Sequence, residues 1–214
     1  MIAVILSTVG GCGTSTMARD FAKEAKGLLI EASNRTRMQD LFLSEPPDAI
    51  EDYMDFLQGK AVSEVAIQGE GYDLIQGNIF HDLEEIEEED FAKAVKSLGD
   101  DDVFVDLSRY REKDIAAWAE VADIFYCVIT NQPGSVRAFD RIQFILRKNK
   151  CPVPVAIIAN RLKPGDREAL EKIESLPLED ARFFNKMEKP AFSLKGETGE
   201  KGEKKSFWSI FKGR

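Results

Sequence analysis

The sequence predicts an α/β fold with a doubly wound, mostly parallel sheet and helices on both faces. Short apolar runs alternate with helical patterns along most of the chain, and a glycine-rich turn follows the first run. The runs are apolar throughout, as in strands that are buried on both faces of a helix-covered parallel sheet. In such folds, ligands bind at the carboxyl ends of the strands.

The expected elements follow one another in strand–helix order. Strands are expected at Ile2–Leu6, Gly27–Ala32, Tyr72–Gln76, Val103–Leu107, Ile124–Thr130 and Val153–Ala159, the last of which is the final clear strand. Beyond the helix after the first turn, helices are expected at Asp48–Leu57, Asp90–Leu98, Ile115–Val121, around Val136, Phe139, Ile142 and Leu146, and at Glu168–Leu176.

Composition narrows the class of protein. The length of 214 residues fits one domain, or one domain plus a tail, and a hydrophobic fraction of 43% is enough for a packed core. A net charge of −9 argues against a nucleic-acid-binding surface, which needs clustered Lys and Arg. The cysteines, Cys12, Cys127 and Cys151, form no CxxC pair, which fits a reducing cytosol, and Cys127 is expected to be buried. The first apolar run is too short for a signal peptide.

The stretch Ser7–Thr16 (STVGGCGTST) predicts a phosphate-binding loop. Glycines let a backbone point successive N–H groups inward, and a helix N-terminus adds partial positive charge. A P-loop reads G-x-x-x-x-G-K-[ST]; here Thr8 replaces the first glycine and Thr14 replaces the lysine, while Ser15 keeps the hydroxyl that reaches Mg²⁺. The candidate nucleotide-binding residues of the loop are Gly10, Gly11, Cys12, Gly13, Thr14, Ser15 and Thr16.

Five stretches, in order along roughly the first four-fifths of the chain, resemble the ParA/MinD group of P-loop ATPases. This group has a deviant Walker A loop that reads K-G-G-x-G-K-[ST]-[ST]. The matching stretches are Gly10–Gly13 with Ser15-Thr16; Leu28–Asp40; Val103–Asp106; Thr130–Pro133 with Ser135–Arg137 and Asp140–Ile142; and Ile158–Arg161.

The resemblance implies the ligands and their contacts. ATP or ADP would bind with Mg²⁺, with Ser15 and Asp106 at the metal. Asp40 would belong to the switch that positions the attacking water, which makes it the candidate catalytic residue. Asn160 would contact adenine, since an amide both donates and accepts hydrogen bonds. The resemblance also implies a homodimer.

The departures from the family pattern concern charge. Val9 replaces the signature lysine that reaches across an ATP-bound dimer, and Thr14 replaces the lysine at the β and γ phosphates. Glu31 and Ser33 stand where the family has its D-x-D pair. Phosphoryl transfer depends on positioning and charge stabilisation, so the chain is expected to be at most a weak ATPase. The loop is similar to that of TadZ/CpaE-like proteins, an atypical branch that marks where Tad pilus machinery assembles.

The residues after the 1–194 domain change character. Residues 195–205 contain no apolar side chain and read as a charged flexible linker. Residues 206–214 are expected to form a short amphipathic helix with Lys and Arg around its apolar face. We expect this helix to bind an anionic membrane surface, although packing on the domain or on a protein partner is the alternative. The membrane-facing residues would be Phe207, Trp208, Ile210 and Phe211.

The sequence therefore predicts a degenerate, nucleotide-binding ParA/MinD-like protein. It would lie in the cytoplasm, at the inner face of the cell membrane, and act as a positional scaffold with a protein partner in envelope machinery. One alternative is an active MinD-type ATPase in which another cation compensates for Thr14. A second is a ParA-type DNA partitioning protein, which the acidic charge disfavours. A third is a protein whose loop binds no nucleotide.

Overall fold

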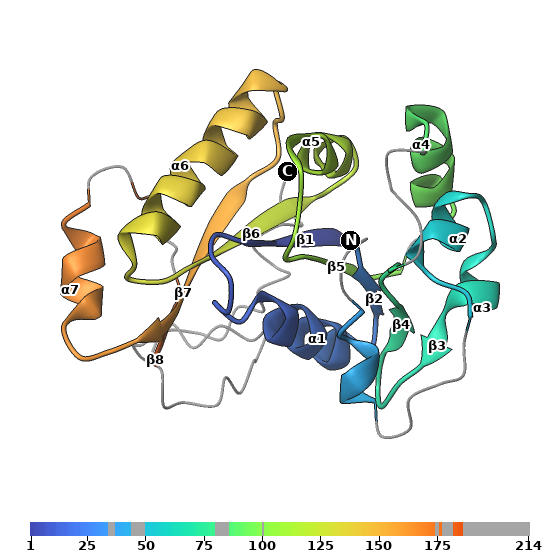
Figure 1. Ribbon diagram of the computed structural model, residues 1–214, viewed down its shortest axis with the longest axis horizontal. Coiled ribbons are helices and arrows are strands. Elements are labelled where there is room, and N and C mark those ends of the chain that lie inside the picture. Colours follow the sequence, from blue (N-terminus) through green and yellow to red (C-terminus); the bar gives the residue numbers. More distant parts are fainter. Residues whose placement is uncertain are drawn as a thin grey trace, which may run out of the picture.

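The computed structural model describes residues 1–33, 37–43, 50–79, 86–99, 101–173, 176 and 182–185 (Figure 1). The strands are β1 Ile2–Ser7, β2 Leu28–Glu31, β3 Ile67–Gln68, β4 Asp73–Ile75, β5 Val103–Leu107, β6 Ile124–Ile129, β7 Val155–Leu162 and β8 Arg182–Asn185. The helices are α1 Thr14–Ala25, α2 Tyr53–Leu57, α3 Val62–Val65, α4 Glu88–Lys96, α5 Glu112–Ala119, α6 Pro133–Lys148 and α7 Asp166–Glu171, with a 3₁₀ turn, η1, at Asp40–Phe42.

The strands of the described residues form one sheet in the order β3-β4-β2-β5-β1-β6-β7-β8. Every neighbouring pair is parallel except β3 and β4. The predicted doubly wound, mostly parallel sheet is therefore confirmed. β1 lies between β5 and β6, with Ile5 opposite both Asp106 and Tyr126. The carboxyl ends of these three strands consequently meet at one edge, where the glycine-rich loop begins.

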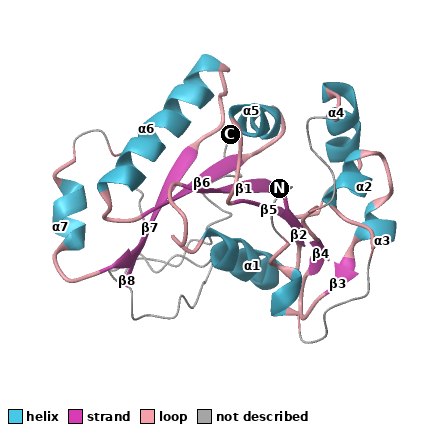
Figure 2. Ribbon diagram, in the orientation of Figure 1, coloured by secondary structure: helices cyan, strands magenta, loops and turns pink. Residues whose placement is uncertain are grey.

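Alternate side chains of β1 point into two hydrophobic layers. Val4 and Leu6 belong to the layer covered by α2, α4, α5 and α6, whereas Ala3 and Ile5 face α1 (Figure 2). In the α1 layer, the ring of Phe21 lies 5.3 Å from that of Tyr126. Fully burying one such side chain stabilises the fold by about 1.5–3 kcal/mol. Both faces of β1 are thus buried under helices, and this packing holds in place the glycine-rich loop that follows β1.

The structure corrects several element boundaries. The helix expected at Asp48–Leu57 begins only at Tyr53, because the carboxylate of Asp52 caps it by accepting the amide of Met54 at 2.7 Å. β7 ends at Leu162, three residues after the expected Ala159. It was expected to be the last clear strand, but β8 follows it. α7 ends at Glu171 and not at Leu176; the short elements α3 and β3 were not expected.

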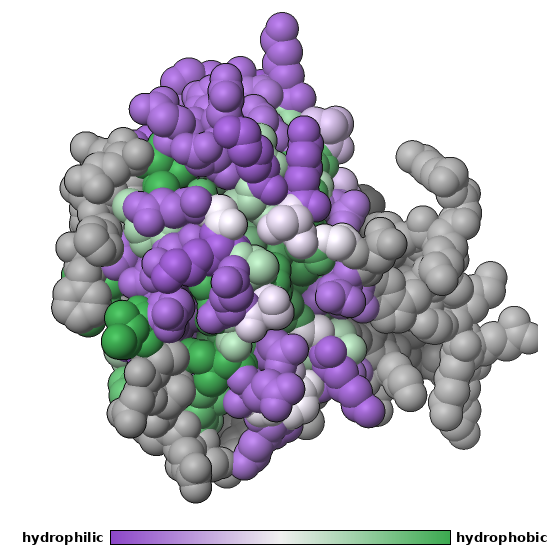
Figure 3. Space-filling view, turned by 90° about the vertical axis from the view of Figure 1, so that its right-hand side faces the viewer, coloured by the Kyte–Doolittle hydropathy of each residue, from purple (hydrophilic) through white to green (hydrophobic). Residues whose placement is uncertain are grey.

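On the face that carries α2, α3 and α4, hydrophilic residues are interspersed with apolar patches (Figure 3). In the described part of the chain, the exposed large hydrophobic residues are Met38, Leu41, Phe42, Ile50, Ile79 and Phe144. Among the described residues, no helix combines the length and the apolar character that a membrane crossing requires. The expected linker 195–205 and tail helix 206–214 lie outside the described residues and stay predictions.

Candidate nucleotide-binding site

The turn between β1 and α1 is built around two glycines with positive φ, Gly11 (74°) and Gly13 (100°). Gly13 is the N-cap of α1 and provides no side-chain cap, so the first amides of the helix have no intrahelical or capping acceptor. A Cβ at Gly13 would lie 2.6 Å from Nδ2 of Asn160, and this close approach requires glycine. The result is a helix N-terminus that presents backbone N–H groups to an anion.

Three side chains brace the inside of this loop. The hydroxyl of Ser7 donates to the carbonyl of Val9 at 2.8 Å and lies 3.3 Å from Sγ of Cys12. Sγ of Cys12 in turn lies 3.1 Å from the hydroxyl of Thr14. Thr14 is buried. At the position of the P-loop lysine, the chain therefore has a short internal hydrogen bond and no cation.

Thr8, at the position of the first P-loop glycine, ties the loop to the neighbouring strand and helix. Its hydroxyl donates to the carbonyl of Val128 in β6 at 2.7 Å and hydrogen-bonds the hydroxyl of Ser135 in α6. Oγ of Ser135 also accepts the amide of Thr130 at 2.8 Å. Since Thr8 and Ser135 are both buried, this contact anchors the start of the loop.

Asn160 in β7 holds the middle of the loop. Its Nδ2 donates to the carbonyl oxygen of Cys12 at 2.7 Å, and the side chain is buried. The sequence placed Asn160 at adenine, and the structure gives its amide a contact with the loop backbone. The adenine contact stays a prediction. The next residue, Arg161, has a left-handed φ of 56°, and its guanidinium lies near Gly11.

Asp106 lies in β5, directly opposite Ile5 of β1, and is fully buried. Burial raises the pKa of its carboxyl, and hydrogen bonding with Ser15, Gln39 and Ser108 opposes that rise. Oδ2 accepts Nε2 of Gln39 at 2.8 Å, whereas Oδ1 has no hydrogen-bond partner among the described residues. The structure thus brings Ser15 and Asp106 together and leaves one carboxylate oxygen unsatisfied.

The roles of two residues, Gln39 and Glu31, were not predicted from the sequence. Nε2 of Gln39 donates to Asp106 and, at 2.9 Å, to the carbonyl of Ser15. Glu31, at the end of β2, accepts the amides of Met38 at 2.9 Å, Gln39 at 3.1 Å and Gly77 at 3.2 Å. Burial raises the pKa of Glu31 to about 7 against these hydrogen bonds. Glu31 therefore fixes the segment that carries Gln39, and no motif signals either role.

Asp40 is the next residue along this segment and begins η1. Its Oδ2 accepts Nε of Arg37 at 2.9 Å, and its Oδ1 is buried without a hydrogen-bond partner in the described part of the chain. Gln39, and not Asp40, makes the contact with Asp106. A catalytic role for Asp40 stays a prediction.

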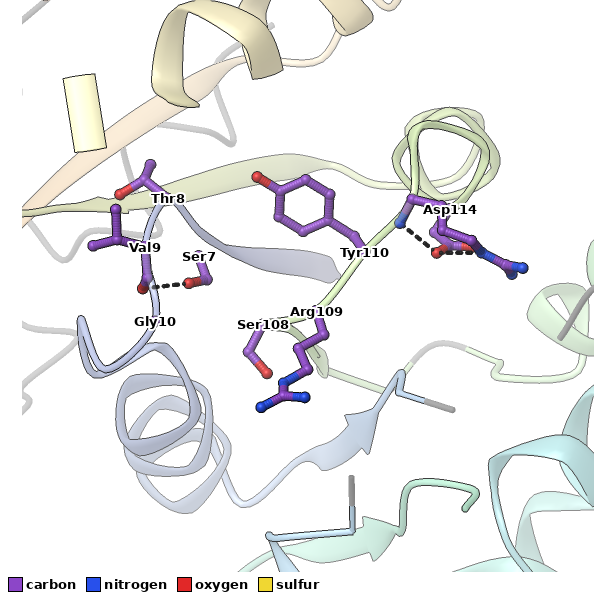
Figure 4. A pocket seen from close by; sticks show the side chains of 9 residues that line it. Ser7, Thr8, Val9, Gly10, Ser108, Arg109, Tyr110 and Asp114 are labelled. Atoms are coloured by element: carbon purple, nitrogen blue, oxygen red, sulfur yellow. Dashed lines mark hydrogen bonds and ion pairs between the residues drawn. The ribbon is translucent and has the colours of Figure 1, made fainter. Parts of the chain in front are cut away.

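A pocket of about 330 Å³ opens between the loop and the segment after β5 (Figure 4). It is lined by Ser7, Thr8, Val9, Gly10, Ser108, Arg109, Tyr110, Arg111 and Asp114. Nη2 of Arg111 donates to Oδ1 of Asp114 at 3.0 Å, while Arg109 is exposed. The pocket joins the loop to the carboxyl end of the strand that carries Asp106.

The residues at this edge fit a nucleotide with Mg²⁺. No three His, Cys, Asp or Glu side chains of the described residues come together as a metal site. Mg²⁺ in phosphate sites typically takes only one or two protein ligands and completes its shell with phosphate oxygens and water. The Ser15 hydroxyl and the unsatisfied Oδ1 of Asp106 match that requirement.

No model of a protein family matches the sequence, and no curated protein matches it. Solved structures do. A ParA family ATPase from Chlorobium tepidum has a TM-score of 0.74 at 19% identity, over 88% of this chain and 85% of that one. A chain of the MinC:MinD cell division protein complex of Aquifex aeolicus has a TM-score of 0.65 at 24% identity, over 78% of this chain and 71% of that one.

The septum site-determining protein MinD from Pyrococcus horikoshii, complexed with Mg-ADP, has a TM-score of 0.63 at 18% identity, over 83% of this chain and 79% of that one. At these identities the likeness concerns the fold. These neighbours agree with the eight-stranded sheet of the described residues and with the loop between β1 and α1. The chain has the fold of the ParA- and MinD-type P-loop ATPases.

Proposed function

We propose that this protein binds ATP or ADP with Mg²⁺ at the loop between β1 and α1. The observation that carries the proposal is the uncapped N-terminus of α1, opened by Gly13 and held by Asn160. Backbone N–H groups at a helix N-terminus favour a phosphate through both hydrogen bonds and the helix dipole. The Mg-ADP bound by a structural neighbour of the same fold supports the choice of ligand.

Ser15 and Asp106 would hold the Mg²⁺. When bound, the ion would neutralise charge between the phosphates. Gln39 positions Asp106 by donating to one carboxylate oxygen and leaves the other available. Glu31 keeps Gln39 in place through the backbone amides of residues 38 and 39.

Hydrolysis is weak or absent in this proposal. Thr14 is turned into the loop toward Cys12 and carries no charge for the transferred phosphate. Removing one preorganised donor from a transition state costs about 2.7–4 kcal/mol, or 10²- to 10³-fold in rate. Val9 offers no cation to a second copy of the chain either. The site is therefore better equipped to hold a nucleotide than to cleave it.

The cellular role proposed is that of a positional scaffold. The neighbours include a ParA family ATPase and a cell division protein complex, which supports a role in spatial organisation with a protein partner. We further propose a nucleotide-dependent homodimer of the TadZ/CpaE-like kind, attached to the inner face of the cell membrane by residues 206–214. Two weak anchors in a dimer bind a membrane far more tightly than one.

Calorimetric titration with ATP and Mg²⁺ tests the nucleotide proposal, with Asp106→Asn as the metal-site control. We expect saturable binding by the wild type and tighter binding by Thr14→Lys, which restores the lysine. Turnover well above background that Asp106→Ala abolishes would refute weak hydrolysis and establish an active MinD-type ATPase.

Sedimentation with anionic liposomes tests the membrane proposal. The intact chain is expected to pellet with the vesicles, and a chain that lacks residues 206–214 is expected to stay in the supernatant. Equal pelleting of both forms would refute the anchor.

A further inference from the structure

Arg109 is the charged residue of the pocket that has no partner among the described residues. It follows the last residue of β5 by two positions and Asp106 by three. The neighbouring Arg111 is held by Asp114 through Nε at 3.2 Å and Nη2 at 3.0 Å. Arg109 is exposed and makes no hydrogen bond or ion pair with the described part of the chain. A guanidinium free of carboxylates is available to an anionic ligand.

The direction of the side chain supports this role. In Figure 4 the guanidinium of Arg109 extends on the side of the sheet that carries α1. The guanidinium of Arg111 is bound to the carboxylate of Asp114 instead. The pocket that Arg109 lines also includes Ser7–Gly10, the first half of the loop. Arg109 and the first half of the loop therefore line a common pocket, beside the strand end that carries Asp106.

The other arginines near the loop are placed differently. Arg37 is bound to Asp40, and the guanidinium of Arg19 lies 4.1 Å from the centre of the Phe42 ring. Arg161 approaches Gly11 from β7, which lies on the opposite side of β1 from β5. Of these cations, Arg109 is the one on the Asp106 side with no partner of its own among the described residues.

We propose that Arg109 contacts the terminal phosphate of bound ATP and supplies, from the same chain, a positive charge that contributes to ATP binding. The inference rests on the proposed nucleotide binding. A guanidinium suits this task because its planar fork donates two parallel hydrogen bonds to phosphate oxygens. The contact selects ATP over ADP, because ADP lacks the phosphate that Arg109 reaches.

The test is to measure the dissociation constants of ATP and ADP, each with Mg²⁺, by calorimetry. The variants are Arg109→Ala, Arg109→Lys and the control Arg147→Ala, which also removes an exposed positive charge, from the last turn of α6. We expect Arg109→Ala to raise the dissociation constant of ATP about tenfold or more and that of ADP less than about twofold. A loss of this size is typical of a missing charge-assisted hydrogen bond. Arg109→Lys recovers part of the ATP affinity, and Arg147→Ala changes neither constant.

Two results would overturn the proposal while leaving nucleotide binding intact. One is an Arg109→Ala variant that binds ATP as the wild type does, and the other is an equal loss of affinity for ATP and ADP. Failure of the wild type to bind either nucleotide would instead refute the proposed function itself, and the role of Arg109 with it. Adding Thr14→Lys to Arg109→Ala is expected to restore the preference for ATP. Thermal melts of each variant show whether it is folded.

Discussion

The side-chain amide of Gln39 donates a 2.8 Å hydrogen bond to the carboxylate of Asp106. This contact links the segment after β2 to the strand beside the phosphate-binding loop. Since Gln39 also donates to the carbonyl of Ser15, a single amide spans the two residues expected at the metal. The segment, the loop and the acidic strand end therefore form one connected unit.

Replacement of Gln39 by Leu tests that unit. We expect Gln39→Leu to lower the free energy of unfolding by about 1–3 kcal/mol, because the buried Asp106 carboxylate loses the donor to its Oδ2. Gln143→Leu is the control, since the Gln143 side chain takes part in an exposed hydrogen bond, which it accepts from Arg147 at 3.3 Å. Urea unfolding of both variants measures the difference. Equal losses would show that the contact with Asp106 contributes nothing.

A pair of glycine substitutions isolates the packing of the loop. Gly13 and Gly59 share a φ of 100°, but a Cβ meets Asn160 at 2.6 Å only at Gly13, whereas Gly59 has open space. Both Ala variants suffer the same backbone strain, so the excess loss of stability in Gly13→Ala reports the clash. We expect thermal unfolding at a lower temperature for Gly13→Ala than for Gly59→Ala. Indistinguishable melting temperatures would contradict the contact between Gly13 and Asn160.

Removal of the Asn160 amide should loosen the loop. In Asn160→Ala the buried carbonyl of Cys12 loses its donor, which costs about 1–3 kcal/mol of unfolding free energy. The matched control is Asn131→Ala, which removes an exposed hydrogen bond to Asp166 of 2.8 Å and should change stability by less than about 0.5 kcal/mol. Nucleotide affinity should fall only in Asn160→Ala. Equal nucleotide affinities of the two variants would contradict the proposal that Asn160 holds the loop in its binding conformation.

Glu31 should make stability depend on pH. Its pKa is raised from 4.5 to about 7 in the fold, so it stabilises the protein below pH 4.5, and that contribution is lost as the pH rises through 7. Between pH 4.5 and about pH 7, we expect the unfolding free energy of the wild type to fall by about 3 kcal/mol more than that of Glu31→Gln. Denaturant curves at successive pH values measure the difference.

The control for Glu31 is Glu64→Gln. The carboxylate of Glu64 also accepts a backbone amide, that of Ala61 at 2.8 Å, but at an exposed site. This variant should keep the wild-type pH profile. Parallel profiles for the wild type and Glu31→Gln would show that the Glu31 carboxyl titrates normally in the fold.

The sheet and the loop were predictable from sequence because both leave strong local signals. Continuous apolar runs mark strands buried on two faces, and Gly11 and Gly13 mark the positive φ values of the turn. Short elements were less visible. β3 and β8 are only two and four residues long, and the start of α2 depends on the single cap Asp52.

Residues of the site were predictable only where they belong to a recognisable sequence motif. Ser15 and Asp106 come from the loop and from the end of an apolar strand, and the structure brings them together. Gln39 and Arg109 follow no motif, because their positions depend on how separate segments meet at the edge of the sheet. Glu31 was noted as a departure from an aspartate pair, yet its contacts are three backbone amides that no sequence pattern encodes.

Calorimetric titration of the intact protein with ATP and Mg²⁺ tests the central claim most directly. An uncapped α1 N-terminus beside an unsatisfied Asp106 oxygen predicts saturable binding that Thr14→Lys strengthens. Absence of any heat of binding at millimolar ATP, with the protein folded, would contradict the claim that this loop holds a nucleotide.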